Sequence, residues 1–235
     1  LADCVFDQIV NNDDFIIIDD FQISSITNCQ LKNIELIETG IEKVDHAAIH
    51  AFNSRLTIQN TIIDNFNIHL NDEHETSNYF VIKTDINLVL KEVSIYNCPS
   101  CHYAVHFQPP SEPQYDEWLG TPIMPEFTVD SCTFSNSGSV FIQNLTDVVN
   151  IINSVFANST DGLIYNLNMN SDGALFDDLQ FQNNTFDGLT NRACFIIIHS
   201  EINFGNCTIK NCHLADENCN PIFEIEVRNG LVFNF

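Results

Sequence analysis

The stretch from Phe127 to Asn136 reads F-T-V-D-S-C-T-F-S-N, and its apolar residues fall in a repeating frame. Phe127 and Val129 are two residues apart, as are Cys132 and Phe134, but a step of three separates the two pairs. Side chains two residues apart lie on one face of a β-strand. The odd step is therefore interpreted as a corner between two short strands, which suits a solenoid and does not suit a helix.

The same frame recurs along the whole chain, and each copy ends in an asparagine. Clear copies begin at Val149, Ala174 and Ile202, partial copies lie upstream, a weaker copy begins at Ala2, and a truncated copy closes the chain at Leu231. Asparagine tolerates left-handed backbone geometry, and its amide can bond to the coils above and below. The row is therefore interpreted as structural. Its members are Asn11, Asn33, Asn65, Asn97, Asn136, Asn158, Asn183 and Asn211.

A third apolar strand is expected in each coil. Strands that recur in the same chain direction pair in parallel, and parallel crossovers are right-handed. The sequence thus predicts an all-β, right-handed parallel β-helix (solenoid) of about eight coils. A single domain is expected over residues 1–235, with a long loop insertion at 108–126, and we expect it to be part of a longer chain or assembly. The third strands are Ile16–Ile18, Ala48–Phe52, Phe80–Ile82, Val105–Phe107, Val140–Ile142, Leu163–Tyr165, Phe195–Ile198 and Ile222–Ile225.

Like residues are expected to stack from coil to coil at the second-strand position of the frame. Phe134, Phe156 and Phe181 should share one column with Ile95 and Ile209. The full column reads Ile9, Leu31, Ile63, Ile95, Phe134, Phe156, Phe181 and Ile209.

The composition limits the possible partners. Only eight Lys and Arg oppose 32 Asp and Glu, which gives a formal net charge of −24. Such acidity argues against nucleic acid and against anionic membrane surfaces, which would repel the chain. No apolar run reaches transmembrane length. The acidity is interpreted as a solvated surface, with weak calcium binding as the alternative.

Nine cysteines and four N-x-[S/T] sequons together favour a secreted, extracellular or cell-surface location. Cys194 and Cys219 precede the third strands of adjacent coils and are predicted to form a disulfide. A local Cys98–Cys101 bridge is a weaker prediction, and the odd count leaves one thiol free or paired with another chain.

N-linked glycans are expected at two sequons before the other two. Asn206 is expected to lie off the asparagine row and to face solvent, and Asn144 lies near a turn. Asn158 and Asn183 belong both to the row and to sequons, so neither can carry a glycan if the row points inward.

The strand pair followed by apolar-x-Asn resembles the right-handed parallel β-helix superfamily, the pectin-lyase-like fold. Repeats such as N-C-T-F-S-N and N-N-T-F resemble those of large protist and bacterial surface β-helix proteins. This superfamily includes polysaccharide lyases and hydrolases as well as adhesins and other solenoids without catalytic activity, so the fold alone does not decide the function.

The expected function is a non-enzymatic structural or surface solenoid: a rod, an adhesin or a filament subunit. Its ends lack an obvious cap, so they should be covered by further chain or by end-to-end self-association. The alternative is a carbohydrate-active or carbohydrate-binding β-helix. That alternative requires a groove lined by acids, a base and aromatic residues from neighbouring coils.

No catalytic residue, cofactor or metal ligand is assigned from the sequence. Hydrolysis needs two facing carboxylates, and Asp13 could lie near Asp19, but the paired aspartates at 13–14, 19–20 and 177–178 are interpreted as solvated surface.

Three further motifs are treated as structural or left open. Cys98-Pro-Ser-Cys101-His102 matches a haem-attachment pattern but is interpreted as disulfide or packing, with a metal site involving His106 as the alternative. The segment His69–Glu75 is interpreted as a solvated loop, with a metal site as the alternative. The long insertion, with Tyr115 and Trp118, could bind sugar or a neighbouring subunit, or cover the solenoid flank.

Overall fold

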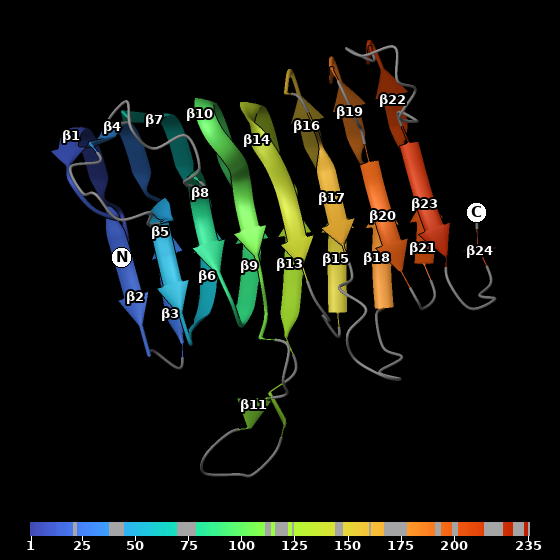
Figure 1. Ribbon diagram of the computed structural model, residues 1–235, viewed down its shortest axis with the longest axis horizontal. Coiled ribbons are helices and arrows are strands. Elements are labelled where there is room, and N and C mark those ends of the chain that lie inside the picture. Colours follow the sequence, from blue (N-terminus) through green and yellow to red (C-terminus); the bar gives the residue numbers. More distant parts are fainter. Residues whose placement is uncertain are drawn as a thin grey trace.

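Three stacks of parallel strands form the molecule, and the chain passes through each stack once per coil (Figure 1). The computed structural model describes residues 1–20, 23–37, 45–69, 79–110, 114–115, 122–123, 125–143, 148–159, 161–166, 178–190, 194–198, 202–213, 223–227 and 233–234. All the described elements are strands. Every pairing between coils is parallel, for example β4 with β7 and β13 with β15. The protein is therefore a parallel β-solenoid of eight coils.

The first stack contains one strand or half-strand from each coil. Two long strands, β10 and β14, continue around a corner into the second stack, so the two stacks form one 14-stranded sheet. The first stack is β1 (Val5–Asn11), β4 (Gln30–Ile37), β7 (Ile62–His69), the first part of β10 (Ser94–Phe107), the first part of β14 (Thr133–Gln143), β16 (Val155–Ala157), β19 (Thr185–Asp187) and β22 (Thr208–Lys210).

The second stack contains one strand from each of the eight coils, and these are the strands that the sequence predicted as the third strand of each coil. It consists of β2 (Ile16–Asp19), β5 (His46–Phe52), β8 (Tyr79–Thr84), the last parts of β10 and β14, β17 (Leu163–Asn166), β20 (Cys194–Ile198) and β23 (Phe223–Val227).

The third stack is a separate 8-stranded sheet. It consists of β3 (Ser24–Thr27), β6 (Arg55–Gln59), β9 (Asn87–Lys91), β13 (Glu126–Asp130), β15 (Val148–Ile152), β18 (Asp178–Gln182), β21 (Ile202–Gly205) and β24 (Phe233–Asn234). A short antiparallel hairpin, β11 (Gln114–Tyr115) with β12 (Pro122–Ile123), belongs to the long insertion. In Figure 1, β11 stands apart from the three stacks.

Two corners of each coil are made by single residues in left-handed conformation. The first corner lies between the third and the first stack, and its residues have φ between 46° and 57°. They are Asp3, Asn28, Asn60, Glu92, Ser131, Asn153, Asn183 and Asn206. The second corner, within or after the first-stack strand, is formed by Gln8, Asn33, Asn65, Asn97, Asn136, Asn158, Gly188 and Asn211, with positive φ throughout. Asparagine is favoured because its side chain tolerates this conformation.

The asparagine row is thus confirmed as structural, but two of its predicted members were assigned to the wrong place. Asn11 is not at a corner, because Gln8 occupies the second corner of the first coil. Asn183 lies at the first corner, and Gly188 takes the second corner of that coil at a φ of 68°. Glycine pays no steric cost there, so a frame identified by asparagine does not find it.

The corner amides form hydrogen-bonded ladders on the outside of the solenoid. Asn60 Nδ2 donates to Asn28 Oδ1 over 2.8 Å, and Asn65 Nδ2 donates to Asn33 Oδ1 over 2.7 Å. The first-corner backbone also bonds between coils, as where Asn60 N donates to the Lys91 carbonyl oxygen over 2.9 Å. Each rung therefore ties one coil to the next.

The core is a continuous apolar column filled by residues of successive coils. Phe134, Phe156 and Phe186 stack with centroid distances of 5.2 and 5.1 Å, and each is at most 2% exposed. Phe134 lies opposite Ile95, as predicted. Ile209 lies opposite Phe186, which was not among the predicted members.

Two members of the predicted column were wrong. Phe181 lies in β18 of the third stack, opposite Ile151, and Phe186 takes its place. In the first coil the member is Phe6, which pairs with Leu31, and not Ile9. Both errors have the cause described for the asparagines: the frame was aligned on Asn183 and Asn11.

Candidate functional site

Small side chains that can donate a hydrogen bond line the inside of the first corner, and four of the nine cysteines occupy this position. The column contains Cys4, Cys29, Cys132 and Cys207, and each thiol donates to the carbonyl oxygen two residues earlier at 3.1–3.4 Å. Ser154 makes the same bond through its hydroxyl. Burial raises the pKa of the Cys132 thiol to about 12. These cysteines serve as hydrogen-bond donors of the corner.

The predicted Cys98–Cys101 bridge is not formed, since both residues are free thiols. Cys98 lies just inside the second corner, where its Sγ donates to the Tyr96 carbonyl oxygen over 3.0 Å. Burial raises its pKa to about 12. The Cys98 thiol is thus bonded to the backbone and not to Cys101. Cys219 lies outside the described residues, so the Cys194–Cys219 disulfide stays a prediction.

Three of the predicted glycosylation sites lie on the outer surface of the corners. Asn158, Asn183 and Asn206 are exposed. Asn206 faces solvent and lies off the second-corner row, as predicted, but it is a member of the first-corner row. Because the rows point outward, burial does not prevent a glycan at Asn158 or Asn183. The Asn183 amide is nevertheless engaged in the ladder, since its Nδ2 donates to Asn153 Oδ1 over 3.1 Å. Asn144 lies outside the described residues.

The haem-like motif is dispersed by the fold. Cys98 and Cys101 are buried, whereas His102 stacks on Tyr79 with a centroid distance of 5.7 Å. His106 stacks between Phe80 and Phe141, with centroid distances of 4.8 and 5.3 Å. Within the described residues these groups do not form a metal-ligating cluster.

Two other predicted elements lie partly outside the described residues. Tyr115 is in β11 of the insertion, opposite Pro122, whereas Trp118 is outside. His69 ends β7, with its Nε2 atom 3.7 Å from Glu35 Oε2, and residues 70–78 are outside.

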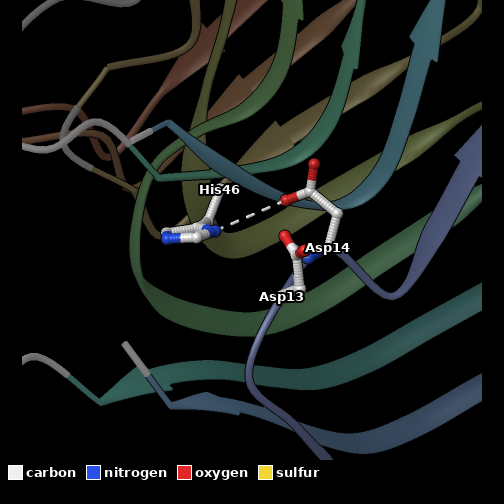
Figure 2. Close-up of side chains that lie close together, drawn as sticks. All are labelled: Asp13, Asp14 and His46. Carbon is white, nitrogen blue, oxygen red and sulfur yellow. Dashed lines mark hydrogen bonds and ion pairs between the residues drawn. The ribbon is translucent and has the colours of Figure 1, made fainter. Parts of the chain in front are cut away.

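A cluster that the sequence did not reveal lies where the first two coils meet. Asp13 and Asp14 belong to the connection between β1 and β2, and His46 and His50 are on β5. Figure 2 shows the His46 ring directed toward the two carboxylates. Asp14 Oδ2 is 2.6 Å from His50 Nδ1, and Asp14 Oδ1 is 3.6 Å from His46 Nδ1.

Asp14 is a buried carboxylate, not the solvated one expected from the sequence. Its side chain is 8% exposed. Burial by itself would raise the pKa of Asp14, but the nearby His46 ring, together with hydrogen bonds from His50 and the Ala47 backbone N–H, outweighs burial and holds the pKa well below its usual range. Asp14 is therefore an anion held among donors. Asp13 beside it is exposed.

A polar groove of about 680 Å³ crosses four coils near the second corner. Its floor and walls include Ser139, Ser159 and Asp161, together with His102 and Tyr103 at one end. Tyr103 stacks on Phe141 with a centroid distance of 4.9 Å. Burial, and after it the charge of Asp161, raises the pKa of Tyr103. The groove thus combines hydroxyl and carboxylate groups with an aromatic ring.

The geometry of the groove follows from a local irregularity in β10. The register between β10 and β14 shifts between Cys98 and Tyr103 and again between Tyr103 and Val105, so β10 carries extra residues there. On the facing strand, Gly138 lies so close to β10 that an added Cβ would come within 2.5 Å of the His102 carbonyl oxygen. Any side chain at position 138 would therefore collide with the wall of the groove.

The strands, corners and core together define the class of this protein as a parallel β-solenoid with asparagine and aromatic ladders. Comparisons with family models, with curated proteins and with solved structures find no match to this chain. Among the described residues there is no helix with the length and apolarity that a membrane span requires.

Proposed function

We propose that this chain is a non-enzymatic structural rod of a secreted or cell-surface assembly, and that further strands continue the solenoid at its ends. The observation that carries this proposal is the open core of the first coil. Phe6 and Ile9 are only half-buried, whereas Leu31 and Ile34, their partners one coil further on, are completely buried. A stacked coil would bury the open side.

The strand edges of the first coil support the same proposal. Among the described strands, β1 pairs only with β4, β2 only with β5 and β3 only with β6. Their outer edges carry unpaired backbone groups, which are a template for another strand. Val5, Val10 and Ile23 beside them are 68%, 59% and 80% exposed. Head-to-tail contacts of this kind do not close, so repeated stacking gives filaments.

The secreted or surface location rests on two other features. Three sequons lie on the exposed corners, and the formal net charge is −24. The parallel solenoid and its asparagine rows resemble surface β-helix proteins, and this resemblance supports a secreted or surface location. The cysteine count carries little weight here, because the corners account for most of the described cysteines.

The oligomeric state in solution tests this proposal. Analytical ultracentrifugation should show mass above 26.6 kDa that increases with concentration. The double variant Phe6→Lys, Ile9→Lys should reduce it, because these side chains line the open core that a stacked coil would cover, and buried charges oppose stacking there. Ile62→Lys, on the side of β7, is the matched control and should assemble like the parent. A monodisperse monomer over the full concentration range would contradict end-to-end assembly.

Carbohydrate binding in the groove is a second candidate, favoured by Tyr103. The Tyr103 ring is stacked between Phe80 and Phe141, at centroid distances of 5.8 and 4.9 Å, so it offers the groove its edge and not a free face. Hydroxyl and amide groups lie beside it, and Asp161 together with the net acidity favours neutral over acidic sugars. Tyr103→Ala should abolish binding of neutral oligosaccharides in calorimetry, whereas Tyr96→Ala, another half-buried tyrosine of β10, should not. Absence of binding to the parent protein would reject this candidate.

A further inference from the structure

We propose that Asp13, Asp14 and His46 form a binding site for a divalent transition metal, with Zn²⁺ the ion that fits the ligands best. The three residues offer ligand atoms that all lie within 4.8 Å of one another. Within the described residues they are the group that meets this condition. The site is independent of end-to-end assembly and of sugar binding.

The separation of the ligand atoms matches coordination better than a direct hydrogen bond. His46 Nδ1 lies 3.6 Å from Asp14 Oδ1. Two ligands of a tetrahedral zinc ion, at about 2.0–2.2 Å from the metal, lie about 3.4 Å apart. An ion between these two atoms would therefore need almost no movement of either side chain.

The ligand types favour a transition metal over calcium. Imidazole nitrogen suits Zn²⁺ and its neighbours, whereas Ca²⁺ takes oxygen ligands. Two carboxylates and one neutral imidazole carry a charge of −2, which a divalent ion neutralises. The side chains of Asp14 and His46 are 8% and 11% exposed, whereas Asp13 is exposed. Two of the ligands are therefore largely shielded from water, and the ion can enter from the side of Asp13.

The surroundings already hold the Asp14 carboxylate in position. The Ala47 backbone N–H donates to Asp14 Oδ1 over 2.7 Å, and His50 Nδ1 lies 2.6 Å from Oδ2. The His50 ring in turn packs on Phe52 with a centroid distance of 3.7 Å. Such outer contacts orient metal ligands and tune their affinity.

Metal binding would fasten the open first coil to the second. Asp13 and Asp14 precede β2, the edge strand of the second stack, and His46 begins β5, with which β2 pairs. The ion would therefore link two consecutive coils where the core is only half-covered. We expect Zn²⁺ to slow amide exchange in β1 and β2 more than in β14.

Calorimetry on the chelator-treated full chain tests the site with Zn²⁺ and, in parallel, with Ca²⁺. One Zn²⁺ per chain is expected, with affinity at least tenfold higher than for Ca²⁺. Asp13→Asn and His46→Gln should each weaken Zn²⁺ binding at least tenfold. Asp19→Asn removes the same charge from an exposed position of the same coil and should leave binding unchanged. Circular dichroism verifies that the variants remain folded.

Three results would overturn the proposal. The first is that the parent chain takes up no stoichiometric Zn²⁺. The second is that Asp19→Asn weakens binding as much as Asp13→Asn, which would indicate diffuse attraction to an acidic surface. The third is that folded His46→Gln binds Zn²⁺ as the parent does, which would leave only oxygen ligands.

Discussion

The first coil and the central coils follow the same frame, but they differ in how their cores are closed. Phe156 lies between Phe134 and Phe186 and is 2% exposed. Phe6, at the same position of the first coil, has Leu31 on one side and stays half-buried. In a solenoid each coil is sealed by its neighbours and not by its own residues.

The two regions also treat histidine differently. In the first two coils, His50 is paired with the Asp14 carboxylate. In the fourth coil, His106 is packed against the rings of Phe80 and Phe141. Burial lowers the pKa of His106, because the charged imidazolium is destabilised away from water. The central coils should therefore be sensitive to mild acid.

Truncating the core phenylalanine should separate the two regions most clearly. Phe156→Ala should lower the free energy of unfolding by about 3–5 kcal/mol, because it leaves a cavity between two rings. Phe6→Ala should cost about 1–2 kcal/mol, because its side chain is already partly in water. Chemical denaturation measures both. Equal losses would mean that the first coil is closed in solution.

Mild acid should destabilise the central coils through His106. Burial, and after it the charge of Lys83, lowers the pKa of His106 to about 4. The unfolded chain takes up this proton near pH 6.5. The contribution of neutral His106 to the free energy of unfolding is therefore fully present above about pH 6.5. It is lost as the pH is lowered toward 4, by about 3 kcal/mol in total.

Replacing His106 by phenylalanine should remove this dependence, because a phenylalanine ring can occupy the same aromatic stack without a proton to bind. Unfolding free energy measured between pH 4 and 7 provides the comparison. The exposed His213→Gln serves as control and should keep the parent's slope. An unchanged slope in His106→Phe would assign the acid sensitivity to another group.

The buried amide of Asn184 should be worth about 2 kcal/mol. Its Oδ1 accepts the Ser154 backbone N–H over 3.0 Å, and its Nδ2 donates to the Ile151 carbonyl oxygen over 2.7 Å. Asn184→Ala leaves both backbone groups buried without these bonds. Thermal denaturation should show the loss, whereas Asn150→Ala, half-buried on β15, should cost well under half of it.

The smallest effect is expected at Glu92 and Gln8, two of the corner positions that lack asparagine. Glu92→Asn should raise the unfolding free energy by about 1 kcal/mol, because asparagine tolerates the φ of 55° better than glutamate does. Gln8→Asn has the same local effect at a φ of 58°, but it lies in an end coil that opens before the rest. Amide exchange should detect it in β1 with little change in the global midpoint.

The repeat frame was sufficient to predict the eight coils and the strands of the second stack, because strand and corner preferences belong to short segments. It went wrong where a corner lacked asparagine, as at Gln8 and Gly188. A search for two left-handed positions per coil, accepting glycine and other polar residues, would have detected the first-corner row, since Asn28, Asn60 and Asn153 are visible in the sequence.

The candidate sites were much less predictable than the fold. The sequence marked Asp13 and Asp14 as a pair but gave no sign of a partner, since His50 is 36 residues away from Asp14. The groove depends on the irregular register of β10 against β14, which no local pattern announces. Trp118 and residues 70–78, which the sequence did single out, lie outside the described residues.

The sequence by itself determined the class of fold, because side-chain alternation and left-handed corner residues act over a few neighbouring positions. The tertiary structure alone decided which residues of different coils meet. Asp14 is buried beside His46 and His50 because β2 pairs with β5. Phe186 stacks in place of Phe181 because β19, and not β18, pairs with β16.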